Sequence, residues 1–245
     1  MHPKPGIDGP KHAIVTGHGL FKKPTVISGQ YRFLEGGTCK KMYIDDQILS
    51  RLGREGSYAF SVYESDRTEV VLGRSCRADE DVMVSRCMED GVPILRRAGG
   101  GGTVVLCRGV VVVSVAGNTD TPFALKQHMT AVNDTIIAGL AGLGVEGLAI
   151  KGISDITIEN RKILGASLHR RKNTVLYQGS LLVDSDMRIF ERYLKHPKKE
   201  PDYREQRPHN EFLTSLALEG YRSDKENLIR VLEKGLSEGP PWKGL

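Results

Sequence analysis

The chain has 245 residues, of which 39% are hydrophobic, so it is long enough for one large domain with a buried core. The formal net charge is +5, and no run of 18 apolar residues occurs, which excludes a membrane-spanning helix. Aromatic residues make up only 6% and are not interleaved with basic ones, which argues against a nucleic-acid partner.

The first twenty residues lack the apolar core of a signal peptide. The four cysteines form no CxxC pair, and the seven histidines are scattered. We therefore expect a cytoplasmic protein with free thiols and no metal site built from protein ligands alone.

Residues 1–30 are rich in Gly, Pro and Lys and are predicted to form an N-terminal extension, with one short strand at 25–34. Residues 31–245 are predicted to form the main domain. Before the glycine-rich stretch we predict a helix at 38–52 that ends at Gly53, strands at 57–65 and 69–75, a helix at 79–90 and a short strand at 92–97.

After the glycines, 103–106 and 110–115 are valine-rich runs around a tight turn and predict a buried hairpin. Thr121-Pro122 predicts the start of a helix with one apolar stripe, formed by Met129, Val132, Ile136, Leu140 and Leu143. The remaining predictions are a meander of three or four strands at 154–184, a short helix at 189–195, and a last helix opened by the capping box Ser223-x-x-Glu226. This order argues against a doubly wound parallel sheet.

Four glycines, 99–102, follow Arg96, Arg97 and Ala98 directly. A Walker A loop is excluded because no Gly-Lys-Ser/Thr follows, and a dinucleotide-binding loop is disfavoured because the glycines lead into a β-branched strand. Two interpretations stay open: a sharp corner between strands, or a loop whose bare backbone N–H groups lie against a carboxylate or phosphate. Two arginines entering the loop favour the second.

A second polar group lies in "KGISDITIENRKILGAS", residues 151–167. A strand carrying Asp155 runs through a turn into Lys162, so we expect the two side chains on neighbouring strands. A lysine beside a turn is usually solvated, and Asp155 alone fits a turn carboxylate. Their place downstream of the glycine-rich loop favours a shared site.

"RRAGGGGTV" resembles the lipoate-binding loop of the lipoate–protein ligases, and "GISDITIENRKILGAS" resembles their Asn-Asp strand and Lys-Ile-x-Gly turn. "QGSLLVD", "MYIDDQIL" and "VVLGRS" are similar to further segments of that family. The resemblance runs in the family's order over residues 31–184. It implies the biotin/lipoate ligase catalytic domain, related to class II synthetases: an α/β (α+β) fold whose mixed, mostly antiparallel sheet is flanked by helices. Residues 31–245 are expected to be this catalytic domain, without a full C-terminal accessory domain.

The resemblance implies site residues position by position. Lys162 matches the lysine that bridges the acyl carbonyl and the α-phosphate, and Asp155 matches the carboxylate beside the nucleotide. The lipoate- and adenylate-binding set is completed by Arg97, Gly100, Gly101, Gly102, Val104, Gly165 and Gly179. ATP and Mg²⁺ are the implied cofactors, with lipoic acid as substrate and Mg²⁺ carried by ATP, near Asp155. The chain departs from the family at Ser154, Gln178 and Leu106-Cys107.

The implied function is activation of lipoate or octanoate to the acyl-adenylate and transfer to a lysine of an acceptor, a lipoyl domain or a glycine-cleavage H-like protein. A separate accessory subunit is compatible with the short chain. Residues 192–207 hold six basic and three acidic residues, which suits an acidic acceptor. Two alternatives stay open: a cysteine-dependent octanoyl or lipoyl transferase of the same fold, and a non-catalytic lipoate-binding protein. Cys107 follows the glycine-rich loop, and no cysteine occurs after it.

Overall fold

The computed structural model describes residues 48–49, 52, 56–222 and 224–244. The predicted extension, the strand at 25–34, Gly53 and most of the helix at 38–52 lie outside these residues. Of that helix, Ile48, Leu49 and Leu52 are described and are helical. In the described part of the chain, no helix combines the length and the apolar character needed to cross a bilayer.

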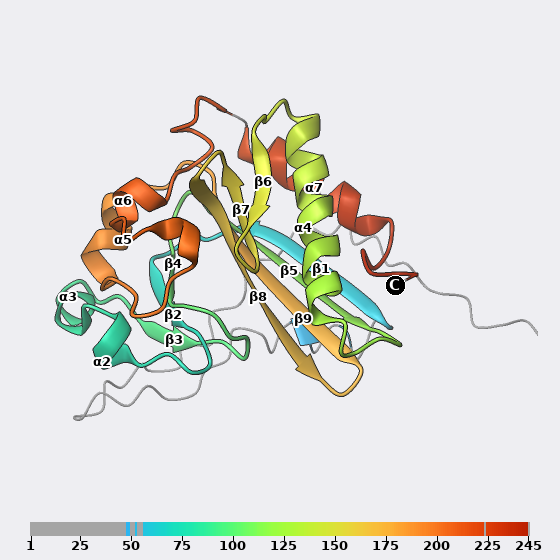
Figure 1. Cartoon of the computed structure of the whole chain (residues 1–245), viewed down its shortest axis with the longest axis horizontal. Coiled ribbons are helices and arrows are strands. Elements are labelled where there is room, and N and C mark those ends of the chain that lie inside the picture. The colour runs from blue at the N-terminus through green and yellow to red at the C-terminus, as the bar shows by residue number, and fades with distance from the viewer. Residues whose placement is uncertain (1–47, 50–51, 53–55, 223, 245) are drawn as a thin grey trace, which may run out of the picture.

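A six-stranded sheet in the order β1-β5-β9-β8-β7-β6 forms the centre of the fold, and every neighbouring pair in it is antiparallel (Figure 1). Its strands are β1 (Tyr58–Glu64), β5 (Val110–Asn118), β6 (Leu148–Lys151), β7 (Asp155–Ile158), β8 (Arg161–Arg171) and β9 (Thr174–Leu182). The predicted meander is confirmed, because β7, β8 and β9 follow one another along the chain and pair in that order. The predicted fold class is confirmed as well.

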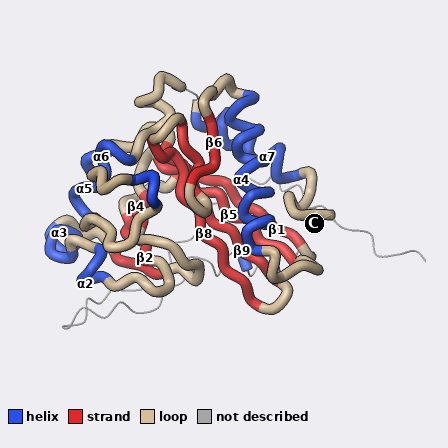
Figure 2. The backbone as a smooth tube through the Cα atoms, viewed as in Figure 1, coloured by secondary structure: helices blue, strands red, loops and turns tan. Residues whose placement is uncertain are grey.

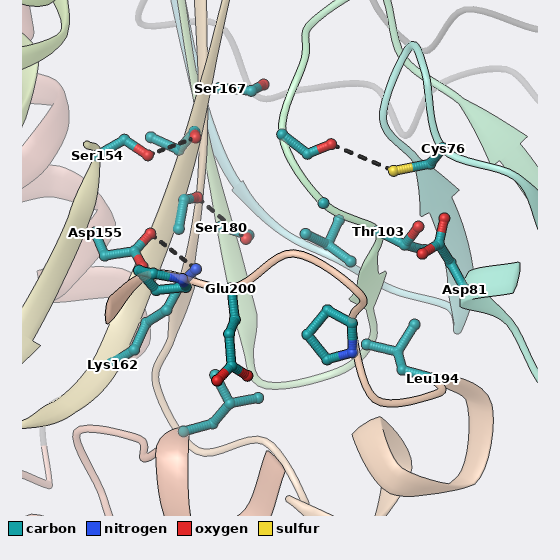
Figure 3. A pocket seen from close by; sticks show the side chains of 18 of the residues that line it. Cys76, Asp81, Thr103, Ser154, Asp155, Lys162, Ser167, Ser180, Leu194 and Glu200 are labelled. Atoms are coloured by element: carbon teal, nitrogen blue, oxygen red, sulfur yellow. Dashed lines mark hydrogen bonds and ion pairs between the residues drawn. The ribbon is translucent and has the colours of Figure 1, made fainter. Parts of the chain in front are cut away.

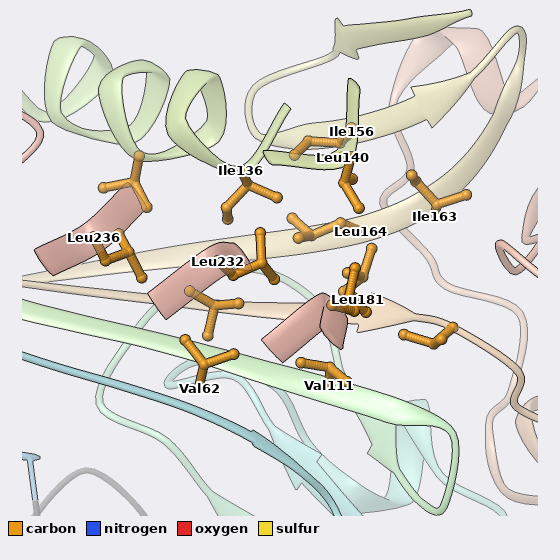
Figure 4. Packing of buried hydrophobic residues seen from close by; sticks show 14 of the residues in the cluster. Val62, Val111, Ile136, Leu140, Ile156, Ile163, Leu164, Leu181, Leu232 and Leu236 are labelled. Carbon is orange, nitrogen blue, oxygen red and sulfur yellow. The ribbon is translucent and has the colours of Figure 1, made fainter. Parts of the chain in front are cut away.

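Two helices, α4 (Leu125–Gly142) and α7 (Lys225–Ser237), cover one face of this sheet (Figures 1 and 4). The predicted stripe of α4 is confirmed, since Met129, Val132, Ile136 and Leu140 are buried in the main core and Leu143 packs against it. The predicted start at Thr121 is wrong. α4 begins at Leu125, because the Thr121 hydroxyl hydrogen-bonds Thr119 Oγ1 (3.2 Å) instead of capping the helix.

A second sheet in the order β3-β2-β4 is formed by β2 (Glu69–Leu72), β3 (Ile94–Arg96) and β4 (Val104–Leu106). The predicted hairpin between 103–106 and 110–115 is therefore wrong. β4 pairs with β2, whereas both edges of β5 are filled by β1 and β9. Gly109 at φ +86° makes a turn after which the chain enters the other sheet. Both strands are apolar on both faces, so the sequence pattern does not distinguish a hairpin from such a crossing.

Short helices gather beside the small sheet (Figure 2). They are α2 (Ala78–Asp81), α3 (Val84–Glu89), α5 (Arg188–Tyr193) and α6 (His209–Phe212). The 3₁₀ helix η1 (Asp202–Arg204) lies between α5 and α6 along the chain. The single helix predicted at 79–90 is divided in two, because Val82 bridges to Leu194. At the last helix, Asp224 is the N-cap and accepts from the Glu226 N–H (3.1 Å), while Ser223 lies outside the described residues.

Candidate active site

A cavity of about 1110 Å³ lies between the uncovered face of the six-stranded sheet and the small sheet with its short helices. All the predicted site residues except Gly100 line it: Arg97, Gly101, Gly102, Val104, Asp155, Lys162, Gly165 and Gly179. Figure 3 shows Asp155 and Lys162 on one side of this space and Thr103 and Cys76 on the other. The fold therefore brings the two sequence motifs to opposite walls of one cavity.

Asp155 and Lys162 form an ion pair, with 2.8 Å between Oδ1 and Nζ. The Asp155 side chain is 11% exposed and the Lys162 side chain 24%. The ammonium is therefore held by a buried carboxylate and still reaches the cavity. The prediction that the two lie on neighbouring strands is confirmed.

A β-bulge turns Lys162 towards the cavity. Thr157 pairs with Lys162, but the next paired residues are Ile156 and Leu164, so Ile163 is an extra residue in β8. Ile163 and Leu164 both enter the main core as a result. Lys162 then lies over Gly165, where an added Cβ would come within 2.7 Å of the lysine Cε and Nζ. Gly165 thus leaves the space that this lysine occupies.

Arg97 is buried and holds the glycine-rich loop. Its Nη2 donates to the carbonyls of Gly100 (2.6 Å) and Gly102 (2.8 Å), and its Nε donates to Ser167 Oγ (3.1 Å) on β8. The guanidinium therefore joins the loop to the large sheet. A contact between Arg97 and a ligand stays a prediction.

Arg96 holds a second loop beside the first. Its Nη1 donates to the carbonyls of Gly73, Arg74 and Cys76, at 2.8, 3.0 and 2.8 Å. The two loops touch at Gly73, where an added Cβ would lie 2.1 Å from the Gly101 carbonyl oxygen. The Arg-Arg pair thus positions both loops at the edge of the cavity.

Within the glycine-rich loop, the four residues differ. A Cβ at Gly99 would lie 2.7 Å from Ser167 Oγ, and Gly101 has φ +83°, a conformation that favours glycine. Gly100 and Gly102 have open space where a Cβ would be placed. The corner interpretation fits Gly99 and Gly101, while a ligand contact at Gly102, which lines the cavity, stays a prediction.

The positions at which the chain departs from the lipoate–protein ligase pattern have two different environments. Ser154 and Gln178 line the cavity, and Ser154 Oγ donates to the Ala166 carbonyl (3.0 Å). Leu106 also lines the cavity, whereas Cys107 is buried in the core beneath the small sheet.

Cys76 is a cavity residue that no sequence motif indicates. It lines the cavity, and its Sγ donates to the Gly101 carbonyl (3.3 Å). No spacing signal identifies it, because β2 and the glycine-rich loop are brought together only by the parallel pairing of β2 and β3.

A segment from residue 195 to 213 forms the third wall of the cavity. It contributes Tyr203, whose hydroxyl donates to Asp155 Oδ2 (2.8 Å), and His209. Burial, and then the nearby cations Arg204, His196 and Lys162, lower the pKa of His209 to about 4. The imidazole is therefore neutral at pH 7.

Lowering the pH below 6.5 is expected to destabilise the fold through His209. The unfolded chain takes up the proton near pH 6.5 and the folded chain only near pH 4, so stability falls across this interval, by up to about 3 kcal/mol. Urea unfolding at pH 7.5 and pH 4.5, with wild type and His209→Asn, measures this contribution. The wild type should lose more stability than the variant, and equal losses would contradict the assignment.

A family model and individual relatives all point to the same protein family. The lipoyl protein ligase A/B catalytic domain matches residues 39–237. The octanoyltransferase LipM of Carboxydothermus hydrogenoformans is 25% identical over 175 residues, 64% of this chain and 65% of that protein. Lipoate-protein ligase A subunit 1 of Thermoplasma acidophilum is 25% identical over 182 residues, 70% of this chain and 69% of that protein. The matched region is thus less than two thirds of the LipM chain.

Solved structures share the fold. A bipartite lipoate protein ligase studied with its E2 lipoyl domain, from Thermoplasma acidophilum, superposes with a TM-score of 0.64 at 21% identity, over 81% of this chain and 80% of that chain. Lipoate-protein ligase A bound with ATP gives 0.62 at 22% identity, over 77% and 76% of the two chains. With the family match over most of its length, the chain belongs to the lipoyl protein ligase A/B catalytic-domain family.

Proposed function

We propose that this chain activates lipoate or octanoate with ATP and transfers the acyl group to a lysine of a lipoyl-acceptor protein, with residues 31–245 as the catalytic domain. The observation that carries the proposal is the Lys162 ammonium, 2.8 Å from Asp155 and facing a cavity that the glycine-rich loop borders. A cavity of about 1110 Å³ has room for an acyl chain and a nucleotide together.

In the first step, a carboxylate oxygen of the acid attacks the α-phosphorus of ATP. The bond to the bridging oxygen breaks, and pyrophosphate leaves with its electron pair. Two anions must approach each other for this, and a fixed ammonium between them stabilises the charge of the transition state. Lys162 is the residue proposed for that role.

In the second step, the amine of the acceptor lysine attacks the acyl carbon. The C–O bond to the phosphate breaks, AMP leaves, and the amine nitrogen loses a proton as the amide forms. The oxyanion of this step develops beside the same phosphate, so Lys162 serves both steps. No covalent bond to the enzyme is needed, and catalysis follows from positioning and electrostatics.

Mg²⁺ would supply further positive charge at the phosphates. Among the described residues, no group of three or more His, Cys, Asp or Glu side chains could hold a metal ion. Asp155 is the carboxylate beside Lys162, and its two oxygens already accept from Lys162 and Tyr203. Mg²⁺ here would therefore take most of its ligands from the nucleotide and from water, and Asp155 would lie near the ion.

The acceptor is proposed to be an acidic lipoyl domain or H-like protein that docks at residues 192–207. Part of the basic charge there has intramolecular partners: Arg192 pairs with Asp90 (2.6 Å), Lys198 pairs with Glu80 (3.2 Å), and Arg204 is buried. Lys199 is exposed beside the cavity and is available to an acidic acceptor. The bipartite ligase of Thermoplasma acidophilum supports the proposal of a separate accessory subunit here.

The second candidate function is a cysteine-dependent acyl transferase, favoured by the similarity to LipM and by Cys76 in the cavity. Cys87 and Cys107 are unsuited to this role. Burial raises the pKa of each thiol to about 11, and a nucleophilic cysteine must ionise near neutral pH. The transferase alternative thus depends on Cys76 among the described cysteines.

We expect lipoate- or octanoate-dependent ATP–pyrophosphate exchange, and acylation of an acceptor lysine detected by mass spectrometry. Cys76→Ser and Cys107→Ser should both keep this activity, because no acyl-enzyme forms. An ATP-independent transfer from an acyl carrier, abolished by Cys76→Ser in a folded protein, would replace the ligase by the transferase. Lipoate binding without either reaction would indicate a binding protein.

A further inference from the structure

Tyr203 is 48 residues from Asp155 in the sequence, yet its side chain contacts the Asp155–Lys162 pair. Its hydroxyl donates to Asp155 Oδ2 at 2.8 Å, while Lys162 Nζ lies 2.8 Å from the other oxygen, Oδ1. The two oxygens of one buried carboxylate are thus each held by a different part of the chain.

The ring of Tyr203 is itself fixed. It packs against Phe212 with 5.2 Å between the ring centroids, and its Cε1 would lie 3.6 Å from a Cβ added at Gly152. Its backbone carbonyl accepts from Arg207 Nη2 (2.8 Å). The phenol therefore reaches Asp155 from a position set by packing.

The same segment also holds the backbone of Lys162. The Thr214 N–H donates to the Lys162 carbonyl (3.0 Å), beside a parallel bridge between Lys162 and Leu213. Both members of the ion pair are thus bonded to residues 203–214, Asp155 through its side chain and Lys162 through its main chain.

We propose that Tyr203 is a positioning residue for the Asp155–Lys162 pair; this rests on the proposed function. A carboxylate with one free oxygen can rotate and take the ammonium in a bidentate pair. The hydrogen bond from Tyr203 to Oδ2 fixes the plane of the carboxylate. It also stabilises part of the negative charge at Oδ2. The Lys162 ammonium is then held at one oxygen and stays directed at the anions that enter the cavity.

Burial, and then the charge of Asp155, raise the pKa of Tyr203 well above its usual range. The phenol is therefore protonated, and a donor, at neutral pH. Because a phenolate could not donate, this agrees with a constant positioning role.

Tyr203→Phe removes the hydroxyl and keeps the ring, and Tyr221→Phe is the matched control. The Tyr221 hydroxyl accepts from the Glu146 N–H (3.0 Å), and Tyr221 does not line the cavity. We expect Tyr203→Phe to lower kcat for acyl-adenylate formation about ten-fold, because a hydrogen bond to a charged group is lost, with KM for ATP within about two-fold. Tyr221→Phe should keep the wild-type kcat.

A second measurement does not depend on activity. In protein with ¹³C-labelled aspartate carboxyls, the Asp155 signal, assigned with Asp155→Asn, should shift in Tyr203→Phe and stay in place in Tyr221→Phe. If wild type shows no ATP–pyrophosphate exchange, the proposed function fails, and the carboxyl signal alone decides the role of Tyr203. An unchanged kcat together with an unchanged signal would overturn the positioning role. So would full activity in Tyr203→Phe with loss only in Tyr203→Ala, which would indicate packing.

Discussion

Lys162→Ala is expected to lower the rate of acyl-adenylate formation by about a hundred- to a thousand-fold, since one preorganised donor to the developing charge is lost. Transfer from preformed acyl-adenylate should fall as well, because the proposed mechanism uses the same ammonium in both steps. The fold should be retained, as Lys162 is partly exposed and its ion pair is with a single carboxylate. ATP–pyrophosphate exchange and single-turnover transfer measure the two steps separately.

Lys162→Arg should restore little activity. The lysine lies so close to Gly165 that a single added Cβ there would come within 2.7 Å of its Nζ, and the larger planar guanidinium does not fit the same space. Lys151→Ala is the matched control. Lys151 lies on β6, which pairs with β7 and not with β8, its Nζ donates to Asn160 Oδ1, and it does not line the cavity. Near-normal adenylation in Lys162→Ala would contradict the ligase assignment.

Gly102→Ala is expected to weaken lipoate binding by roughly ten- to a hundred-fold, the cost of overpacking a tight contact, while the melting temperature stays unchanged. Gly102 lines the cavity and has open space where the Cβ would lie, so the methyl group can conflict only with a ligand. Calorimetric titration with lipoate and thermal unfolding of the same sample measure both quantities.

Gly101→Ala is the informative contrast. Its φ of +83° is strained for alanine, and the added Cβ would lie 3.2 Å from Arg97 Nη2. We expect the melting temperature to fall by about 2–8 °C, whatever the ligand does. Normal lipoate binding by Gly102→Ala would show that the loop only forms a corner.

The Asp155–Lys162 pair could be predicted from sequence because a short turn joins two antiparallel strands, and such strands place neighbouring residues together. The orientation of Lys162 could not, since it depends on the extra residue Ile163 in β8. Bulges have no reliable single-sequence signal, and the KILG spacing alone would put Lys162 and Gly165 on opposite faces of a regular strand.

The role of Arg97 was harder to predict for a different reason. Composition suggests that an arginine beside glycines binds an anion, but its guanidinium donates to carbonyls of the loop itself and to Ser167. Those acceptors belong to the glycine-rich loop and to β8 of the large sheet, and tertiary packing decides how closely the two approach. Tertiary packing also decides that β4 pairs with β2 instead of forming a hairpin with β5. It likewise brings Tyr203 to Asp155, which is 48 residues away in the sequence.

The strand order has a consequence for how the site assembles during folding. The wall that carries Asp155 and Lys162 is built from β6 to β9, which pair with their sequence neighbours and close only short loops. The glycine-rich loop depends instead on β2 pairing with β3, and the central strand β5 must find β1 upstream and β9 downstream. Local pairings form faster because less chain entropy is lost in closing them. The ion pair is therefore expected to be in place early, and the opposite wall of the cavity is completed with the slow, non-local part of the folding reaction.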